Sequence, residues 1–446
     1  MNIAIGKYTL ESLTSGMYNT PMVIYREYVQ NAIDAIDDAI EHGIIQAEKA
    51  RVTIEIDSDA QRIVVEDNGS GIAAKDVELQ LLGIGNSNKG LLNRRGFRGI
   101  GRLVGIGYTD QLSFYTSCIG EKIGTIISID CKELRQILIP GQYENFGMVD
   151  ALKHVIKRTE YIEKPELHYF RVVLSGICDN KQILNYDQVS DYLCQTAPLP
   201  YNPDCFSRGA QIEQACLEAG HPLSHYSIFL KQRDSEEEQL FKFYSDRFLV
   251  NMSKHQVDHL QNVHIRPIMA NNGDVAALLW YGQSCYLGTI LDDKLKGLRF
   301  RKGNILVGDR STANLLFKEE RFNGWFQGEV FVFDARILPN SRRDDFELNE
   351  NYHHILAELS KIGTDLSREI RQVSSKRNGG NNVYDNIRII SNQSPAAVTK
   401  YPQINLCSKL NHSEKKLLEK VFEVLDDQYL KKSPNLKQLI IDKMTK

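Results

Sequence analysis

The 446-residue chain lacks paired cysteines, long apolar runs and a strong net charge. Its eight cysteines are scattered without a CxxC pair, which indicates neither a zinc site nor a disulfide framework and is typical of reduced cytosolic thiols. No apolar run approaches the roughly 18 residues that a membrane helix needs, and the first residues lack a signal-peptide pattern. The formal charge of -3 is too small to predict a nucleic-acid partner by itself. We therefore expect a cytoplasmic protein with no membrane partner.

Three polar segments carry the chemistry, and the first is REYVQNAID at residues 26–34. The apolar residues of this region recur at helical spacing, so Glu27, Asn31 and Asp34 share one face of a predicted helix. A carboxylate can take a proton from an attacking water, and a neutral amide oxygen can bind Mg²⁺. The alternative is a solvated polar stripe on an amphipathic helix, which is the common meaning of an isolated ExxxN pattern.

The second segment follows a predicted strand that begins at Arg62 and has the sequence DNGSG at residues 67–71. Asp67, at the end of this strand, can accept a hydrogen bond from an exocyclic amine such as that of adenine. Gly69 and Gly71 let the backbone pass close to a planar base. The alternative is an ordinary tight turn, because Asn-Gly and Ser-Gly are common turn dipeptides.

The third segment is rich in glycine and asparagine and runs from Gly83 to Gly101. Its glycines precede a helix-like stretch that begins at Leu103, so their backbone amides can bind phosphate oxygens. Residues 83–98 have the composition of a mobile lid. A glycine-rich loop without such a function is the alternative.

The three segments, in this order within 101 residues, resemble the ATP site of the GHKL superfamily, which includes gyrase, the ninety-kilodalton heat-shock chaperone, histidine kinases and MutL. The resemblance implies an ATP-binding domain of the Bergerat α/β-sandwich type, with Asn31 on Mg²⁺ and Glu27 activating water. Family members usually have a Gly-Thr pair where this chain has HYFRV from His168, so the last phosphate contact is unassigned. The implied nucleotide-binding residues are Asn31, Asp34, Asp67, Gly69, Gly71, Ser87, Lys89, Gly96, Arg98, Gly99 and Gly101.

A second, strand-rich region leads to the sequence LPNSRRDDF at residues 338–346. This segment resembles the transducer domain of the heat-shock chaperone and of Microrchidia (MORC) ATPases, in which an arginine reaches the ATP γ-phosphate. The resemblance implies a catalytic role for Arg342, with Arg343 as the second choice and Lys302 as a rival. The alternative is a surface arginine paired with a neighbouring aspartate.

These features predict an α+β protein with three regions. Residues 1–198 form the ATP-binding domain, which ends at a proline break, and residues 199–346 form a transducer-like α/β domain. Residues 347–446 form a helical tail with a flexible break near 374–405.

The resemblance implies an ATP hydrolase that forms a homodimeric clamp when nucleotide is bound. A histidine kinase is a rival, but it would need a phosphoacceptor helix and only 26 residues precede Glu27. A second rival is a non-hydrolysing, nucleotide-switched scaffold. The partner stays open between a client protein, DNA and a phage-defence effector.

Overall fold

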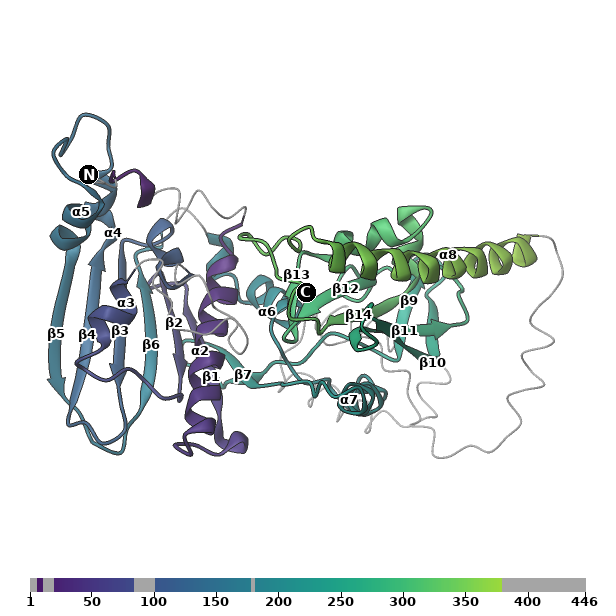
Figure 1. Cartoon of the computed structure of the whole chain (residues 1–446), viewed down its shortest axis with the longest axis horizontal. Helices are drawn as coiled ribbons and strands as arrows, with labels where there is room; N and C mark the ends of the chain where they lie inside the picture. Colours follow the sequence, from purple (N-terminus) through teal and green to yellow (C-terminus); the bar gives the residue numbers. More distant parts are fainter. Residues whose placement is uncertain (1–5, 11–19, 84–100, 178–180, 379–446) are drawn as a thin grey trace, which may run out of the picture. The chain divides into compact units, whose positions relative to one another are not determined.

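The structure of the chain is a computed structural model that describes residues 6–10, 20–83, 101–177 and 181–378. The chain divides into two compact units, Met1–Val373 and Ser374–Lys446. Nearly all described residues belong to the first unit, which contains two large sheets (Figure 1). The expected mixture of helices and large sheets is therefore confirmed.

The first sheet has eight strands in the order β5-β4-β3-β6-β2-β1-β7-β8. Neighbouring strands are antiparallel except for β1 and β7, which run parallel. The strands are β1 (Arg51–Asp57), β2 (Arg62–Asp67), β3 (Gln111–Ser117), β4 (Ile123–Asp130), β5 (Ile156–Ile162), β6 (Tyr169–Ser175), β7 (Ser227–Gln232) and β8 (Glu238–Gln239).

Helix α2 (Val23–Glu41) is the predicted amphipathic helix, and its apolar face packs into the core of the first sheet. Figure 1 shows α2 and α3 against one face of this sheet, and the apolar residues of both belong to the same core. The other helices and 3-10 helices of this region are η2 (Ala47–Lys49), α3 (Val77–Leu82), η3 (Gly101–Gly107), α4 (Cys131–Ile137), α5 (Met148–Val155), η4 (Lys181–Leu184) and α6 (Tyr186–Thr196).

The second sheet has six strands in the order β13-β12-β14-β11-β10-β9. Alternate residues of β11 enter two different cores, because successive side chains of a strand point to opposite faces. Helix α8 (Glu350–Asn378) belongs to one core and α7 (Gly209–Glu218) to the other. The remaining elements are β9 (Arg247–Asn251), β10 (Gln256–Met269), β11 (Val275–Ser284), β12 (Gly297–Lys302), β13 (Ile305–Val307), η5 (Arg310–Leu316), η6 (Glu320–Trp325) and β14 (Gln327–Val332).

The chain after the expected domain boundary at residue 198 contributes to both sheets. Strand β7 follows that boundary but pairs with β1, and its Ile228 and Leu230 are buried in the core of the first sheet. Residues 201–218 contribute instead to a core of the second sheet, through Tyr201 and Phe206 among others. The chain thus passes to the second sheet, returns to the first and leaves it again.

The segment after the expected boundary at residue 346 begins with a helix. Helix α8 buries Tyr352, Ile355 and Leu359 in a core of the second sheet. The helix continues to Asn378, past the expected start of a flexible break at 374. The rest of that break and of the tail lies outside the described residues. Within the described ranges, no helix is both long and apolar enough to cross a membrane.

Candidate functional site

Helix α2 holds the three polar residues of the first segment on one face. Glu27 is only 7% exposed, Asp34 is buried and Asn31 is half-buried. A solvated stripe would leave these side chains exposed, so the burial favours a site over the surface alternative. Buried carboxylates are costly unless they are paired, and Glu27 has Arg26 and Arg343 beside it.

Alternation along β2 brings Asp67 to the inner side of the sheet. Ile63, Val65 and Asp67 are buried in turn, while the residues between them are half-buried. The Asp67 Oδ1 atom accepts a hydrogen bond from the Gly69 amide at 2.9 Å. Burial raises the pKa of Asp67 to about 8, against the opposing effect of that hydrogen bond. A carboxyl group with such a raised pKa can accept a hydrogen bond from an amine of a ligand, and it can lose its proton when that ligand binds.

The turn after β2 packs directly on α2. The Ser70 amide donates to the Ala35 carbonyl of α2 at 3.0 Å. A Cβ atom at Gly69 would lie 2.6 Å from the Ala35 carbonyl carbon. At Gly71 the backbone has φ +64°, and a Cβ atom there would overlap the Ser117 carbonyl oxygen. Gly69 therefore permits the close approach to α2, and Gly71 permits a close approach to β3. The contacts with Ala35 join the first two segments into one structure.

The end of the third segment meets Glu27. Gly101 begins η3, and a Cβ atom at this position would overlap the Glu27 Oε2 atom. The η3 helix is held to α2 by the Tyr28 hydroxyl, which accepts from the Gly105 amide at 3.0 Å. The other predicted residues of this segment lie outside the described residues: Ser87, Lys89, Gly96, Arg98 and Gly99.

The loop at residues 338–346 brings Arg343, not Arg342, to Glu27. The Arg343 Nε atom lies 3.8 Å from Glu27 Oε1, and the Arg343 side chain is 15% exposed. Its backbone has φ +57°, an uncommon conformation for a residue with a side chain. The Gly308 amide, at the end of β13, donates to the Arg343 carbonyl at 2.9 Å and fixes the loop.

The side chain of Arg342 is exposed, and its contribution comes from the backbone. The Arg342 carbonyl accepts from Arg26 Nη2 at 3.1 Å, and the same Nη2 atom lies 3.4 Å from Glu27 Oε1. Arg26 precedes Glu27 on α2 and thus connects this helix to the loop. The arginine side chain near Glu27 is therefore that of Arg343, while Arg342 contacts α2 through its backbone.

Lys302 is bound elsewhere in the second sheet. Its Nζ atom donates to the carbonyls of Asp334 at 2.6 Å and Phe333 at 3.3 Å. Burial lowers the pKa of Lys302 to about 8, although Asp334 opposes the shift. Lys302 therefore binds the backbone that follows β14.

Two residues near the site were not assigned from the sequence. His168 Nδ1 lies 2.8 Å from the Gly69 carbonyl, so the residue that departs from the family's Gly-Thr pattern contacts the turn that carries Asp67. Arg26 is the second such residue. Its place directly before Glu27 in the sequence was the one feature that could have indicated a role in the site.

The assembled residues suit ATP with Mg²⁺. A buried carboxyl group is available for a base amine, and an amide oxygen on α2 for a hard cation. Gly69 and Gly71 allow the turn after β2 to pack closely on the neighbouring backbone, and a carboxylate faces an arginine. Such a donor set is compatible with the class of nucleotide-binding sites.

Comparison with known families agrees with this class. Residues 19–151 match the family described as histidine kinase-, DNA gyrase B-, and HSP90-like ATPase. The matched range contains α2, the turn after β2 and η3, and it supports a GHKL-type ATPase domain, which implies ATP binding. No curated protein matches the chain.

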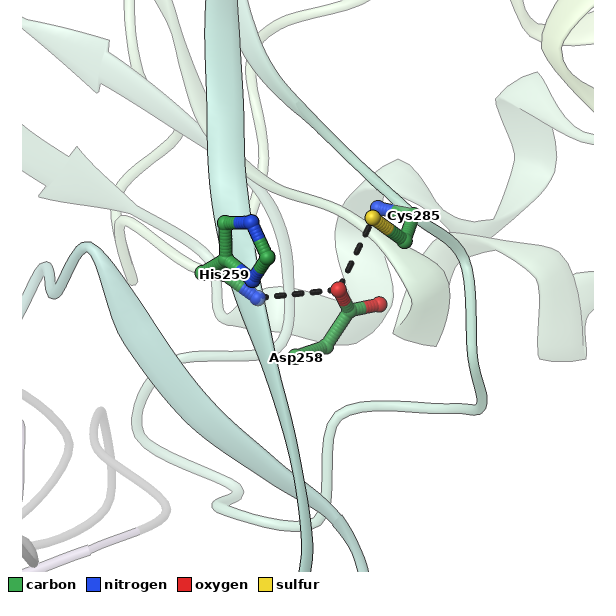
Figure 2. Close-up of side chains that lie close together, drawn as sticks. All are labelled: Asp258, His259 and Cys285. Atoms are coloured by element: carbon green, nitrogen blue, oxygen red, sulfur yellow. Dashed lines mark hydrogen bonds between the residues drawn. The ribbon is translucent and has the colours of Figure 1, made fainter. Parts of the chain in front are cut away.

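A second polar cluster lies on β10 and the segment after β11. Figure 2 shows Asp258, His259 and Cys285, whose potential metal-binding atoms lie within 4.8 Å of one another. The buried Asp258 carboxylate, however, accepts from four donors: the amides of His259, Cys285 and Leu287 and the Ser284 hydroxyl. These donors occupy the carboxylate lone pairs, so we interpret Asp258 as the anchor of this turn and assign no metal site there.

Proposed function

We propose that the chain is a Mg²⁺-dependent ATPase whose catalytic carboxylate is Glu27. The observation that carries the proposal is the environment of Glu27, which is buried, packed against Gly101 and 3.8 Å from Arg343 Nε. A general base beside an arginine is the pair that phosphoryl transfer to water needs. The family match of residues 19–151 supports the same reaction class.

In this proposal Asp67 accepts the exocyclic amine of adenine, and Asn31 offers its amide oxygen to Mg²⁺. The metal ion would neutralise charge on the phosphates. The amides of Gly99 and Gly101 bind phosphate oxygens together with Lys89. Asp34 completes the polar face of α2.

The hydrolytic step follows from these positions. Glu27 takes a proton from the attacking water while the water oxygen bonds to the γ-phosphorus. The bond from the γ-phosphorus to the bridging oxygen breaks, and ADP leaves with that electron pair. The guanidinium of Arg343 stabilises the charge on the transferred phosphoryl group. Glu27 then releases its proton to solvent.

A turnover assay with matched variants tests this function. Glu27→Ala should lower ATP turnover by about 10²-fold or more and leave ATP affinity within a few fold, because only the general base is lost. Glu41→Ala, an exposed position at the end of the same helix, should behave like the parent. Equal turnover in the Glu27→Ala protein and the parent would remove Glu27 from the mechanism.

We infer further that nucleotide binding produces a homodimeric clamp of the chaperone or Microrchidia kind. The resemblance of residues 338–346 to those transducer segments supports this inference, and so does the contact of their Arg343 with Glu27. Light scattering should show a dimer with a non-hydrolysable ATP analogue. A monomer under saturation would refute the clamp and leave the chemistry intact.

A nucleotide-switched scaffold that hydrolyses ATP weakly or not at all is the second candidate, with DNA or a phage-defence effector as its partner. The arginine beside Glu27 favours hydrolysis, because a scaffold needs no group that stabilises a transition state. Turnover by the parent separates the two. Capture of client protein, DNA or effector by ATP-trapped Glu27→Ala would identify the partner class.

A further inference from the structure

Gln30 is a buried amide on α2 without a hydrogen-bond partner in the described part of the chain. It is 1% exposed, and both Oε1 and Nε2 lack a partner. In the described part of the chain, Gln30 is the residue in which both side-chain polar atoms are buried in this way. A buried polar group left unsatisfied costs about 1–3 kcal/mol, and a side chain with two such atoms requires an explanation.

The position of Gln30 on α2 supplies that explanation. Gln30 comes three residues after Glu27 and four before Asp34, so the three side chains follow one another along the same face. Both of its neighbours on this face are buried as well. On this helix the face around Glu27 also meets Gly101 and Arg343, the groups assigned above to the γ-phosphate end of the site.

We propose that Gln30 is a further catalytic residue, whose amide contacts the attacking water and a γ-phosphoryl oxygen. The inference rests on the proposed ATPase function. Oε1 can accept a hydrogen bond from the water whose other proton goes to Glu27, and Nε2 can donate to the phosphoryl oxygen. A neutral amide can orient the nucleophile without competing for its proton, as glutamines do in other nucleotide hydrolases.

This role predicts an unusual combination of effects for Gln30→Met, which keeps the length of the side chain and removes the amide. Turnover should fall by about tenfold or more, because the water and the phosphoryl group lose a preorganised contact. Affinity for ADP should stay within about twofold, while affinity for ADP with aluminium fluoride, which imitates the transferred group, should fall with turnover. Thermal stability should stay level or rise, since an unsatisfied amide has been removed.

The matched control is Gln327→Met. Gln327 is also fully buried, but its Nε2 donates to the Ser245 carbonyl at 2.7 Å and its Oε1 accepts the Ser245 amide at 3.3 Å. Its replacement should lower stability and leave turnover per folded molecule unchanged. A structural glutamine and a catalytic one therefore give opposite patterns.

The outcomes separate this inference from the proposed function. Parent-like turnover and parent-like affinity for ADP with aluminium fluoride in Gln30→Met would overturn the inference, and an inactive Glu27→Ala protein beside it would leave the ATPase standing. Destabilisation or loss of folding in Gln30→Met would overturn it too, because the amide would then have a structural partner. A parent chain without turnover would refute the ATPase itself, and unchanged affinity for the fluoride complex would still count against Gln30.

Discussion

Arg343 from the second sheet's loop and Glu27 from the first sheet's helix form a close pair, with 3.8 Å between Nε and Oε1. The two residues are separated by more than three hundred positions in the sequence. Their contact joins the helix that carries the proposed general base to the loop that carries the proposed transition-state donor. Loop geometry sets the distance, because the Gly308 amide holds the Arg343 carbonyl and the Arg343 backbone has positive φ.

The first prediction separates the two arginines of this loop. Arg343→Ala should lower turnover by about 10²-fold or more, because charge on the transferred phosphoryl group loses a donor. Arg342→Ala should have a small effect, since its side chain is exposed and the Arg26 contact uses the backbone carbonyl. Lys302→Ala should retain turnover, because that lysine is bound to carbonyls of Phe333 and Asp334. Steady-state assays of the three variants check this order, and a larger loss in Arg342→Ala than in Arg343→Ala would contradict it.

The second prediction concerns the protonation of Asp67. Its pKa of about 8 means that the carboxyl group is largely protonated below that pH in the absence of nucleotide. An amine donor favours the ionised form, so ATP affinity should increase as pH rises from about 6 to about 8 and then level off. Calorimetry in buffers of different ionisation enthalpy should detect proton release on binding. Asp67→Asn should abolish binding, whereas Glu66→Gln, on the opposite face of β2, should not.

The folding stability of the nucleotide-free protein should fall as pH rises, whereas ATP affinity should increase. The folded-state pKa of Asp67 is raised above its ordinary value of 3.8, so its contribution to stability is full below about pH 4 and is lost as pH rises through about 8. Asp67→Asn removes this titration. The variant should therefore gain stability relative to the parent across that window in urea unfolding, and a pH-independent difference would contradict the assignment.

Local pattern predicted α2 and β2, the two elements that carry the polar residues of the first two segments. Apolar spacing identifies α2, and alternation along β2 explains why Asp67 is buried while Glu66 is not. The parallel pairing of β7 with β1 was not predicted, because a parallel neighbour carries no local turn signal. The expected boundary at residue 198 therefore took no account of the return of the chain to the first sheet.

The sequence could not decide which arginine of the loop at residues 338–346 lies beside Glu27. Two adjacent arginines are equivalent in sequence, and the choice between them depends on backbone dihedrals and on a hydrogen bond from Gly308. Gln30 gave no signal either, because a glutamine on an amphipathic helix is usually solvated. Its burial comes from packing around α2, which spacing alone does not reveal.

The third prediction tests Arg26 as the connection between α2 and the loop. Arg26→Gln removes the donor to the Arg342 carbonyl and should lower turnover by about tenfold through misplacement of Arg343. Combined with Arg343→Ala it should add little, because both changes remove the same contribution. Arg51→Gln, in an exposed ion pair with Glu237, is the control and should retain turnover. If the double variant lost turnover by the product of the two single losses, the coupling of Arg26 to Arg343 would be contradicted.

The last prediction concerns the buried charges that join the end of α6 to the second sheet. The Glu329 carboxylate accepts from Lys242, Arg301, Tyr201 and Trp280. Arg301 in turn donates to the Gln195 carbonyl of α6 at 2.8 Å. Glu329→Gln keeps the shape but leaves the buried Arg301 guanidinium without its anion, and burial, which lowers the pKa of Lys242 to about 7, then favours the neutral amine. The free energy of unfolding should therefore fall by about 3–5 kcal/mol.

Acidification should remove the difference in the free energy of unfolding between the parent and Glu329→Gln. Burial acts to raise the pKa of Glu329, but the charges of Arg301 and Lys242 outweigh it and lower the pKa to about 2. A lowered folded-state pKa gives stability that is present above about pH 4.5 and is lost as pH falls through about 2. The parent and Glu329→Gln should therefore converge in urea unfolding as the solution is acidified. Glu237→Gln, which breaks an exposed pair, should cost less than about 1 kcal/mol. A Glu329→Gln protein as stable as the parent at neutral pH would show that this network does not hold α6 to the second sheet.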